Sequence, residues 1–194
     1  MTVRVIFISP AIGTALRQAR FDDDGPLDEG GLRSACAAAS ALPGVDRVLV
    51  SPSTRCRQTA DALGLAAAEV APALRGCAMG RWRGRTLDEL SAEEPEAVLA
   101  WLTDPAAAPH GGESVRQLCA RVARWLDEAS ESAGRLLVVA EPDVIRAAAL
   151  HVLGAPEQAF WRLDVPPLSG TELTGRTARW NLRLASPLTR REDG

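Results

Sequence analysis

The sequence contains no lysine and no tyrosine. Arginine supplies all 22 basic residues, which are outnumbered by 25 acidic ones, so the formal net charge at pH 7 is -3. The chain therefore has no overall basic field that would attract nucleic acid, and we expect no nucleic-acid partner.

Long apolar runs are also missing. No stretch approaches the roughly 20 residues that a membrane-spanning helix needs, so we expect no membrane role. The four cysteines, Cys36, Cys56, Cys77 and Cys119, form no CxxC pair, and from the N-terminal residues we expect no signal peptide. We therefore expect reduced thiols in a cytoplasmic protein that has no cofactor.

The composition is that of a globular domain, because 46% of the 194 residues are hydrophobic and 24% are charged. No internal repeat divides the chain. We expect a single domain over residues 1–186, followed by a loose polar tail over residues 187–194.

Short strands and longer helices alternate along the chain. Continuously apolar segments, typical of strands buried on both faces of a parallel sheet, lie at 3–8, 45–50 and 135–140. Helical patterns cover 27–42, 54–63, 114–132 and 144–153, the last stopped by Gly154. This alternation predicts an α/β fold, a three-layer α/β/α sandwich with a mostly parallel central sheet.

The later parts of the chain depart from this rhythm. Residues 160–165 and 171–184 have the pattern of two further strands, with a hairpin turn at Gly175. Segment 71–112 has several turn signals and one short helical pattern at 94–102. About 40 residues without a strand pattern indicate a functional insertion, which we expect to form a cap over a pocket at the sheet.

A polar motif follows the second predicted strand directly. In SPSTRCRQTA, either Ser51 or Ser53 can cap the helix that begins here. The N-terminus of a helix attracts anions, and Arg55 in its first turn can reach a bound anion. Alternatively, Arg55 is an ordinary surface arginine.

The longer segment SPSTRCRQTADALGL resembles the S-P-x-x-R-A-x-Q-T-A segment of the histidine phosphatase superfamily, the phosphoglycerate mutase-like proteins. Other blocks follow in the family's order: GPLDEGGLRSA, LRGCAMGRWRGRTLDEL, HGGESVRQLCARVARWL, LLVVAEPDVIRAAALHVLG and VPPLSGTEL. The resemblance spans residues 3–184 and implies the phosphoglycerate mutase-like fold. The branch it resembles most is that of small-substrate phosphatases, such as α-ribazole phosphatase.

The resemblance also implies a chemistry. In the family, a histidine of an Arg-His-Gly motif at the end of the first strand becomes phosphorylated, and a second histidine follows a later strand. Arginines grip the phosphate and a glutamate acts as acid or base. Of these positions the chain keeps Arg55, and it departs from the family at Ser9, Pro10, Gly76 and Glu141.

Each departure removes a function. Pro10 stands in place of the nucleophile, and its ring nitrogen is locked in a tertiary amide, so it cannot carry a phosphoryl group. Ser9 replaces a guanidinium that would grip phosphate. Gly76 replaces the glutamate, and Glu141 replaces the second histidine. The resemblance therefore implies a degenerate member with no confident catalytic residue.

Glu141 places a carboxylate where a phosphate would bind. Two like unit charges about 4 Å apart repel by on the order of 4 kcal/mol at an effective dielectric constant of 20. The carboxyl group must therefore be protonated or paired. Arg55 is the expected partner, and Arg146, one turn beyond Glu141, is a weaker candidate. The pocket can then receive an anion at Arg55, or a ligand with a cation or hydrogen-bond donor for Glu141.

The expected ligand-binding residues are Ser9, Arg55, Trp82, Glu141 and Arg146. Trp82 either walls the site or packs in the core. Ser9 either caps the turn at the strand end or acts as a nucleophile with Glu141 as its base, an arrangement that lacks a histidine in register.

The two histidines do not restore the family's mechanism. His110 precedes a Gly-Gly-Glu-Ser turn and is out of register with the nucleophile, and His151 lies inside the helix after Glu141. The acidic run 22–24 could join Glu141 and Asp143 as ligands of Mg²⁺. Three consecutive acids cannot all face one point, so we expect a solvated turn and no metal.

Three functional hypotheses follow. The favoured one is a pseudoenzyme that binds a small molecule or a partner protein through the remodelled pocket. The alternative is a phosphatase or other hydrolase of small phosphorylated metabolites that uses a non-histidine mechanism. The third is a scaffold, such as a homodimer, in which the pocket is vestigial.

Overall fold

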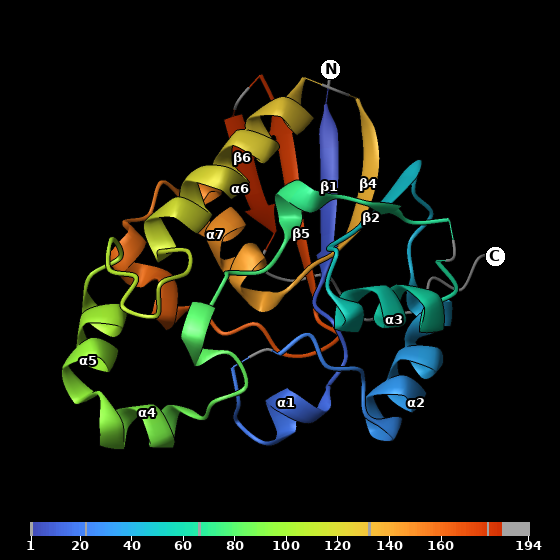
Figure 1. Ribbon diagram of the computed structural model, residues 1–194. Coiled ribbons are helices and arrows are strands. Elements are labelled where there is room, and N and C mark those ends of the chain that lie inside the picture. Colours follow the sequence, from blue (N-terminus) through green and yellow to red (C-terminus); the bar gives the residue numbers. More distant parts are fainter. Residues whose placement is uncertain (1, 22, 66, 132, 178, 184–194) are drawn as a thin grey trace.

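Six strands form one sheet (Figure 1). The computed structural model describes residues 2–21, 23–65, 67–131, 133–177 and 179–183. The strands are β1 (Val3–Ile8), β2 (Arg47–Val50), β3 (Glu69–Val70), β4 (Gly134–Val139), β5 (Gly170–Arg176) and β6 (Arg179–Arg183). Their order is β3-β2-β4-β1-β5-β6. The first four are parallel, β5 is antiparallel to β1, and β6 is antiparallel to β5.

Helices cover both faces of this sheet. They are α2 (Glu29–Ala38) and α3 (Thr54–Ala62) on one face, and α6 (Val115–Ser130) and α7 (Pro142–Leu153) on the other. Alternate residues of β1 reach opposite faces: Val5 and Phe7 pack with α6 and α7, while Ile8 packs with α3. The predicted three-layer α/β/α fold with a mostly parallel sheet is confirmed.

The long helices begin and end where their capping residues predict. Ser114 accepts a hydrogen bond from the Gln117 amide while the Gln117 side chain accepts from the Ser114 amide, which starts α6 with a capping box. Gly154 has φ of 58° and ends α7 in the left-handed conformation. No helix in the described part of the chain is long and apolar enough to cross a membrane.

Two predictions for the last part of the chain are wrong. Residues 160–165 form no strand; they belong to the 3-10 helix η4 (Glu157–Arg162) and the turn after it. Pro166 and Pro167 follow, and neither can donate to a ladder. The hairpin does not turn at Gly175, which lies within β5, but after β5, where Thr177 has φ of 51°.

Segment 71–112 contains η2 (Pro72–Leu74), η3 (Gly80–Trp82), α4 (Leu87–Glu93) and α5 (Pro95–Thr103). The single helix expected at 94–102 is therefore preceded by a second one. With the short helix α1 (Thr14–Arg17), α4 and α5 lie beyond the carboxyl ends of β1 and β4 (Figure 1). A 3-10 turn, η1 (Ala39–Ala41), extends α2. The domain boundary at 186 and the tail 187–194 lie outside the described residues and stay predictions.

Candidate functional site

The carboxyl ends of β2 and β4 bring together an arginine and a glutamate. Ser53 follows β2 and caps α3, because its Oγ accepts a hydrogen bond of 3.2 Å from the Cys56 amide. Of the two serines considered, the cap is thus Ser53. Glu141 follows β4 and is the N-cap residue of α7, but its side chain makes no capping bond. Its carboxylate is therefore available to α3.

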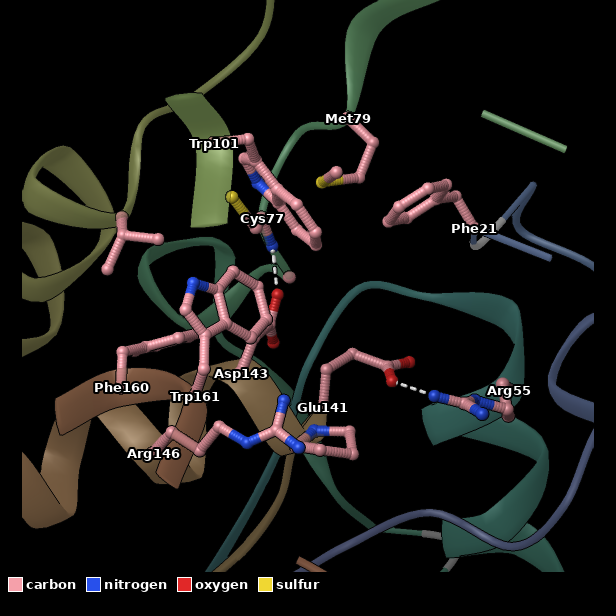
Figure 2. Close-up of a pocket in the computed structure, with 13 residues that line it drawn as sticks. Phe21, Arg55, Cys77, Met79, Trp101, Glu141, Asp143, Arg146, Phe160 and Trp161 are labelled. Atoms are coloured by element: carbon pink, nitrogen blue, oxygen red, sulfur yellow. Dashed lines mark hydrogen bonds and ion pairs between the residues drawn. The ribbon is translucent and has the colours of Figure 1, made fainter. Parts of the chain in front are cut away.

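That carboxylate forms an ion pair with Arg55, the expected partner (Figure 2). Glu141 Oε2 accepts from Arg55 Nη2, and Oε1 accepts from Ser53 Oγ at 2.8 Å. Only 11% of the Arg55 side chain and 7% of the Glu141 side chain are exposed. The pair is therefore a buried salt bridge, because removal of one partner would leave the charge of the other out of contact with water.

Cys56 adds a third contact to the carboxylate, because its thiol lies 3.4 Å from Glu141 Oε1. Burial raises the pKa of this thiol, and the charge of Glu141 raises it further. The thiol therefore stays protonated and donates to Glu141, which excludes a reactive thiolate at this position.

Gly76 lies directly beside Glu141. A Cβ atom at position 76 would be 3.2 Å from Glu141 Cγ and 3.6 Å from Asp143 Oδ2. A glutamate here would bring a third carboxylate against two others. The glycine therefore leaves room for the Glu141 side chain and lowers the local negative charge.

Asp143 is the second carboxyl group at the start of α7. Its Oδ1 accepts from the Val144 amide at 2.7 Å, and its Oδ2 accepts from the Cys77 amide. Burial raises the pKa of Asp143 to about 6, and the charge of Glu141 adds to the rise against the effect of the Cys77 hydrogen bond. Asp143 thus titrates close to neutral pH.

These groups line a cavity of about 220 Å³ (Figure 2). One part of its wall is polar or charged and includes Arg55, Gly76, Glu141, Asp143 and Arg146. The other part is apolar and aromatic and includes Phe21, Met79, Trp101, Phe160 and Trp161. The structure therefore brings four of the considered positions, Arg55, Gly76, Glu141 and Arg146, into one pocket.

Arg146 is not the partner of Glu141. Its Nε donates to the Leu163 carbonyl at 2.7 Å. Its guanidinium carbon lies 5.8 Å from the ring centroid of Phe160 and 6.0 Å from that of Trp161. Both distances are typical of cation–π contacts. Arg146 therefore belongs to the aromatic side of the pocket.

Ser9 and Pro10 are not among the residues that line the cavity. Ser9 is completely buried; its Oγ donates to the Pro166 carbonyl and accepts from the Ser169 amide at 2.9 Å. This hydroxyl fastens the end of β1 to the turn before β5. The expectation that Ser9 contacts a ligand is therefore corrected in favour of the turn-capping alternative, because the buried hydroxyl is bound to the turn and does not line the cavity.

Trp82 is also corrected. It is completely buried, and its ring centroid lies 5.7 Å from Phe21, 5.7 Å from Trp101 and 5.2 Å from His110. Packing of these rings places Trp82 behind the cavity wall, as the core alternative required. The tryptophans at the cavity are instead Trp101 and Trp161, which the sequence motifs did not single out.

Neither histidine reaches the pocket. His110 is buried against Trp82, its Nδ1 accepts from the Gly112 amide at 3.0 Å, and burial lowers its pKa. His151 lies on α7 with its Nε2 at 3.3 Å from Asp127 Oδ1 on α6. The chain has no other histidine, so no imidazole is available beside Arg55.

The acidic run 22–24 caps turns where it is described. Asp23 Oδ1 accepts from the Gly25 amide, and Asp24 Oδ1 accepts from the Thr54 amide at 2.7 Å. Asp22 lies outside the described residues. Among residues that are described, no group of three or more histidines, cysteines or acids is arranged to hold a metal ion.

The family model of the histidine phosphatase superfamily (branch 1) matches residues 14–186. The chain belongs to this superfamily. The predicted resemblance to this superfamily is confirmed.

Two curated relatives are phosphatases. The glucosyl-3-phosphoglycerate phosphatase of Mycobacterium tuberculosis is 33% identical over 183 residues, which cover 82% of each chain. The adenosylcobalamin/α-ribazole phosphatase of Salmonella typhimurium is 31% identical over 149 residues, which cover 72% of this chain and 73% of the relative.

A solved structure of a mycobacterial glucosyl-3-phosphoglycerate phosphatase, in complex with VO3, has a TM-score of 0.81 to this chain at 28% identity. The alignment covers 93% of this chain and 96% of that one. The superfamily member described here therefore keeps the fold of a phosphatase over nearly its full described length.

Proposed function

We propose that this superfamily member is a pseudoenzyme that binds a small molecule or a partner protein through the remodelled pocket, without phosphohistidine catalysis. The observation that carries the proposal is the Arg55–Glu141 ion pair. The one arginine kept from the family's phosphate site is neutralised within the protein, so it no longer offers a free positive charge to a phosphate dianion.

Two further observations support the proposal. The nucleophile position holds Pro10, which has no group that can accept a phosphoryl group. Any phosphate placed at Arg55 would also lie close to Glu141, at a repulsive cost on the order of 4 kcal/mol for unit charges about 4 Å apart at an effective dielectric constant of 20. Phosphohistidine chemistry thus lacks both its nucleophile and its anion site.

A phosphatase assay on p-nitrophenyl phosphate tests this proposal. The wild-type protein should give no turnover above the uncatalysed background. Turnover that is abolished by Glu141→Gln or Ser9→Ala would overturn the pseudoenzyme. Arg162→Gln, which changes an exposed arginine that does not line the cavity, is the control for handling and contaminating phosphatase.

Orthovanadate binding tests the anion site separately from turnover. The wild-type protein should show no thermal stabilisation by orthovanadate. The Glu141→Gln variant should be stabilised by orthovanadate, because it lacks the carboxylate that competes with the anion for Arg55. At 100 times the dissociation constant a ligand stabilises a fold by about 2.7 kcal/mol, which is readily measured. Equal stabilisation of both proteins would contradict a closed phosphate site.

The second candidate is a phosphatase of small phosphorylated metabolites with a non-histidine mechanism. It is favoured by the relatives, two of which are named as phosphatases at 31% and 33% identity. Glucosyl-3-phosphoglycerate and α-ribazole phosphate are the substrates to test. Release of phosphate from either, lost in Asp143→Asn but kept in Asp164→Asn, would favour this candidate. A scaffold or homodimer stays an alternative that an oligomeric-state measurement addresses.

A further inference from the structure

The pocket contains two charged side chains that the Arg55–Glu141 pair does not use. Asp143 and Arg146 are three residues apart at the start of α7, so they lie on the same face of this helix. Both line the cavity. The structure shows no ion pair for either of them within the described part of the chain. One cavity wall thus presents an acidic and a basic side chain that a ligand can contact.

The guanidinium of Arg146 is held in place but keeps hydrogen-bond donors that no described residue accepts from. Its Nε donates to the Leu163 carbonyl, and its plane is held against Phe160 and Trp161. The four N–H groups on its two terminal nitrogens have no acceptor among the residues that are described. A planar carboxylate matches such a guanidinium edge, because it can accept two parallel hydrogen bonds.

Asp143 is likewise fixed and unsaturated. Each of its oxygens accepts one backbone N–H, from Val144 and Cys77, which leaves lone pairs free on both. Its neighbour Glu141 is anionic and already bound by Arg55. Burial raises the pKa of Asp143 and the charge of Glu141 adds to the rise, while the charge of Arg121 lowers it. An ammonium group on a ligand would donate to the lone pairs that remain on the Asp143 oxygens.

The rest of the wall selects a flat apolar group. The ring centroids of Trp101 and Trp161 are 4.3 Å apart, and Phe21 meets Trp101 edge-on at 5.4 Å. Trp161 is 37% exposed although it is a large aromatic residue. Figure 2 shows these rings on the side of the pocket opposite the Arg55–Glu141 pair. The volume of about 220 Å³ is below the roughly 300–1,000 Å³ of sites for drug-sized ligands, so one small molecule fits.

We propose that the pocket binds a small aromatic zwitterion, of the class of aromatic α-amino acids, with its carboxylate at Arg146, its ammonium group at Asp143 and its ring against Trp101 and Trp161. This ligand class rests on the proposed binding function. A phosphate ester without an amine satisfies only Arg146, and a simple aromatic amine satisfies only Asp143.

Calorimetric titration of the full chain with four probes tests the ligand class. L-Phenylalanine carries the ring and both charges, 3-phenylpropionate lacks the ammonium group, phenethylamine lacks the carboxylate, and glycine lacks the ring. L-Phenylalanine should bind at least about tenfold more tightly than each of the other three, since each loses a charged hydrogen bond or the aromatic contact. Equal affinity for L-phenylalanine and either single-charge probe would overturn the proposal.

Two substitutions assign the charges. Arg146→Gln should weaken L-phenylalanine and 3-phenylpropionate by about tenfold or more and leave phenethylamine unchanged. Asp143→Asn should weaken L-phenylalanine and phenethylamine and leave 3-phenylpropionate unchanged. Arg162→Gln and Asp164→Asn, which are exposed and outside the cavity lining, are the matched controls. If a variant fails to fold, the relative affinities of the wild-type protein for the four probes still test the proposed ligand class.

The same preparations are assayed on p-nitrophenyl phosphate, so that the two proposals fail separately. Turnover of p-nitrophenyl phosphate by the wild-type protein would overturn the proposed function, whichever of the four probes the protein binds. An inert wild-type protein that gives no heat with L-phenylalanine, or whose affinity for it is unchanged in both Arg146→Gln and Asp143→Asn, would overturn the ligand class alone.

Discussion

Glu141 places its carboxylate at the start of α3. The carboxylate takes one guanidinium nitrogen of Arg55, the Ser53 hydroxyl and the Cys56 thiol, all from the first turn of α3 or its cap. These are the groups that an anion at the start of α3 would otherwise meet. The side chain thus replaces a bound anion, and Gly76 leaves the space it needs.

Glu141→Ala should destabilise the protein by about 3 kcal/mol, because it breaks the buried ion pair that Glu141 makes with Arg55. The free energy of unfolding from urea denaturation measures the loss. Glu69→Ala, which breaks an exposed pair with Arg47, should lose at most about 1 kcal/mol.

The double variant Arg55→Leu with Glu141→Leu should lose less stability than Glu141→Ala, since no uncompensated charge remains. Strictly additive losses from the two positions would contradict the ion pair as the source of the effect.

The hairpin of β5 and β6 depends on a glycine for packing. A Cβ atom at position 175 would lie 2.7 Å from two ring atoms of Trp180, directly across the hairpin. The sequence suggested a turn at Gly175 because glycine most often marks turns. The structure gives it a different use, which is close contact with an aromatic ring on the neighbouring strand.

Gly175→Ala should lower the free energy of unfolding by about 1–3 kcal/mol, since the Trp180 ring must move to admit the methyl group. Thermal and urea unfolding measure the change. Gly44→Ala is the control, because an added Cβ atom there meets nothing within 4 Å. A control that loses as much as Gly175→Ala would show that the effect comes from backbone freedom and not from the ring.

Elements with a strong local signal were predicted well. The apolar run of β1 and the glycine stop of α7 depend on residues close in the chain, so the sequence specified them. The prediction of a strand over residues 160–165 is wrong because the apolar Phe160 is buried in the core from a 3-10 helix and not from a strand. A short apolar run alone does not separate a strand from a buried helical turn.

At the scale of the whole molecule, half of the pocket could be predicted. Arg55 and Glu141 follow two different strands, and the carboxyl ends of parallel strands meet at one edge of the sheet. The aromatic half could not, because Phe21, Trp101 and Trp161 come from three distant segments whose meeting depends on tertiary packing. The motif pointed to Trp82 instead, which supports that wall from behind.

The stability of the whole molecule should depend on pH through Asp143. Its pKa is about 6 in the folded protein against 3.8 for an ordinary aspartate, so the native state binds the proton more tightly than the unfolded state. The contribution of Asp143 to the free energy of unfolding is then fully present below about pH 4 and is lost as the pH rises through about 6. Two pKa units correspond to about 3 kcal/mol.

Asp143→Asn removes this ionisation, so the variant should gain about 3 kcal/mol relative to the wild-type protein between pH 4 and pH 7, measured by urea unfolding at each pH. The groups that act on the pKa of Asp143 are Glu141, Arg121 and the amides of Cys77 and Val144. Asparagine has one acceptor oxygen for these two amides, and the cost of the lost hydrogen bond does not depend on pH. Asp164→Asn, an exposed site, should give a difference that does not change with pH. A flat difference for Asp143→Asn as well would mean that Asp143 is not held away from solvent.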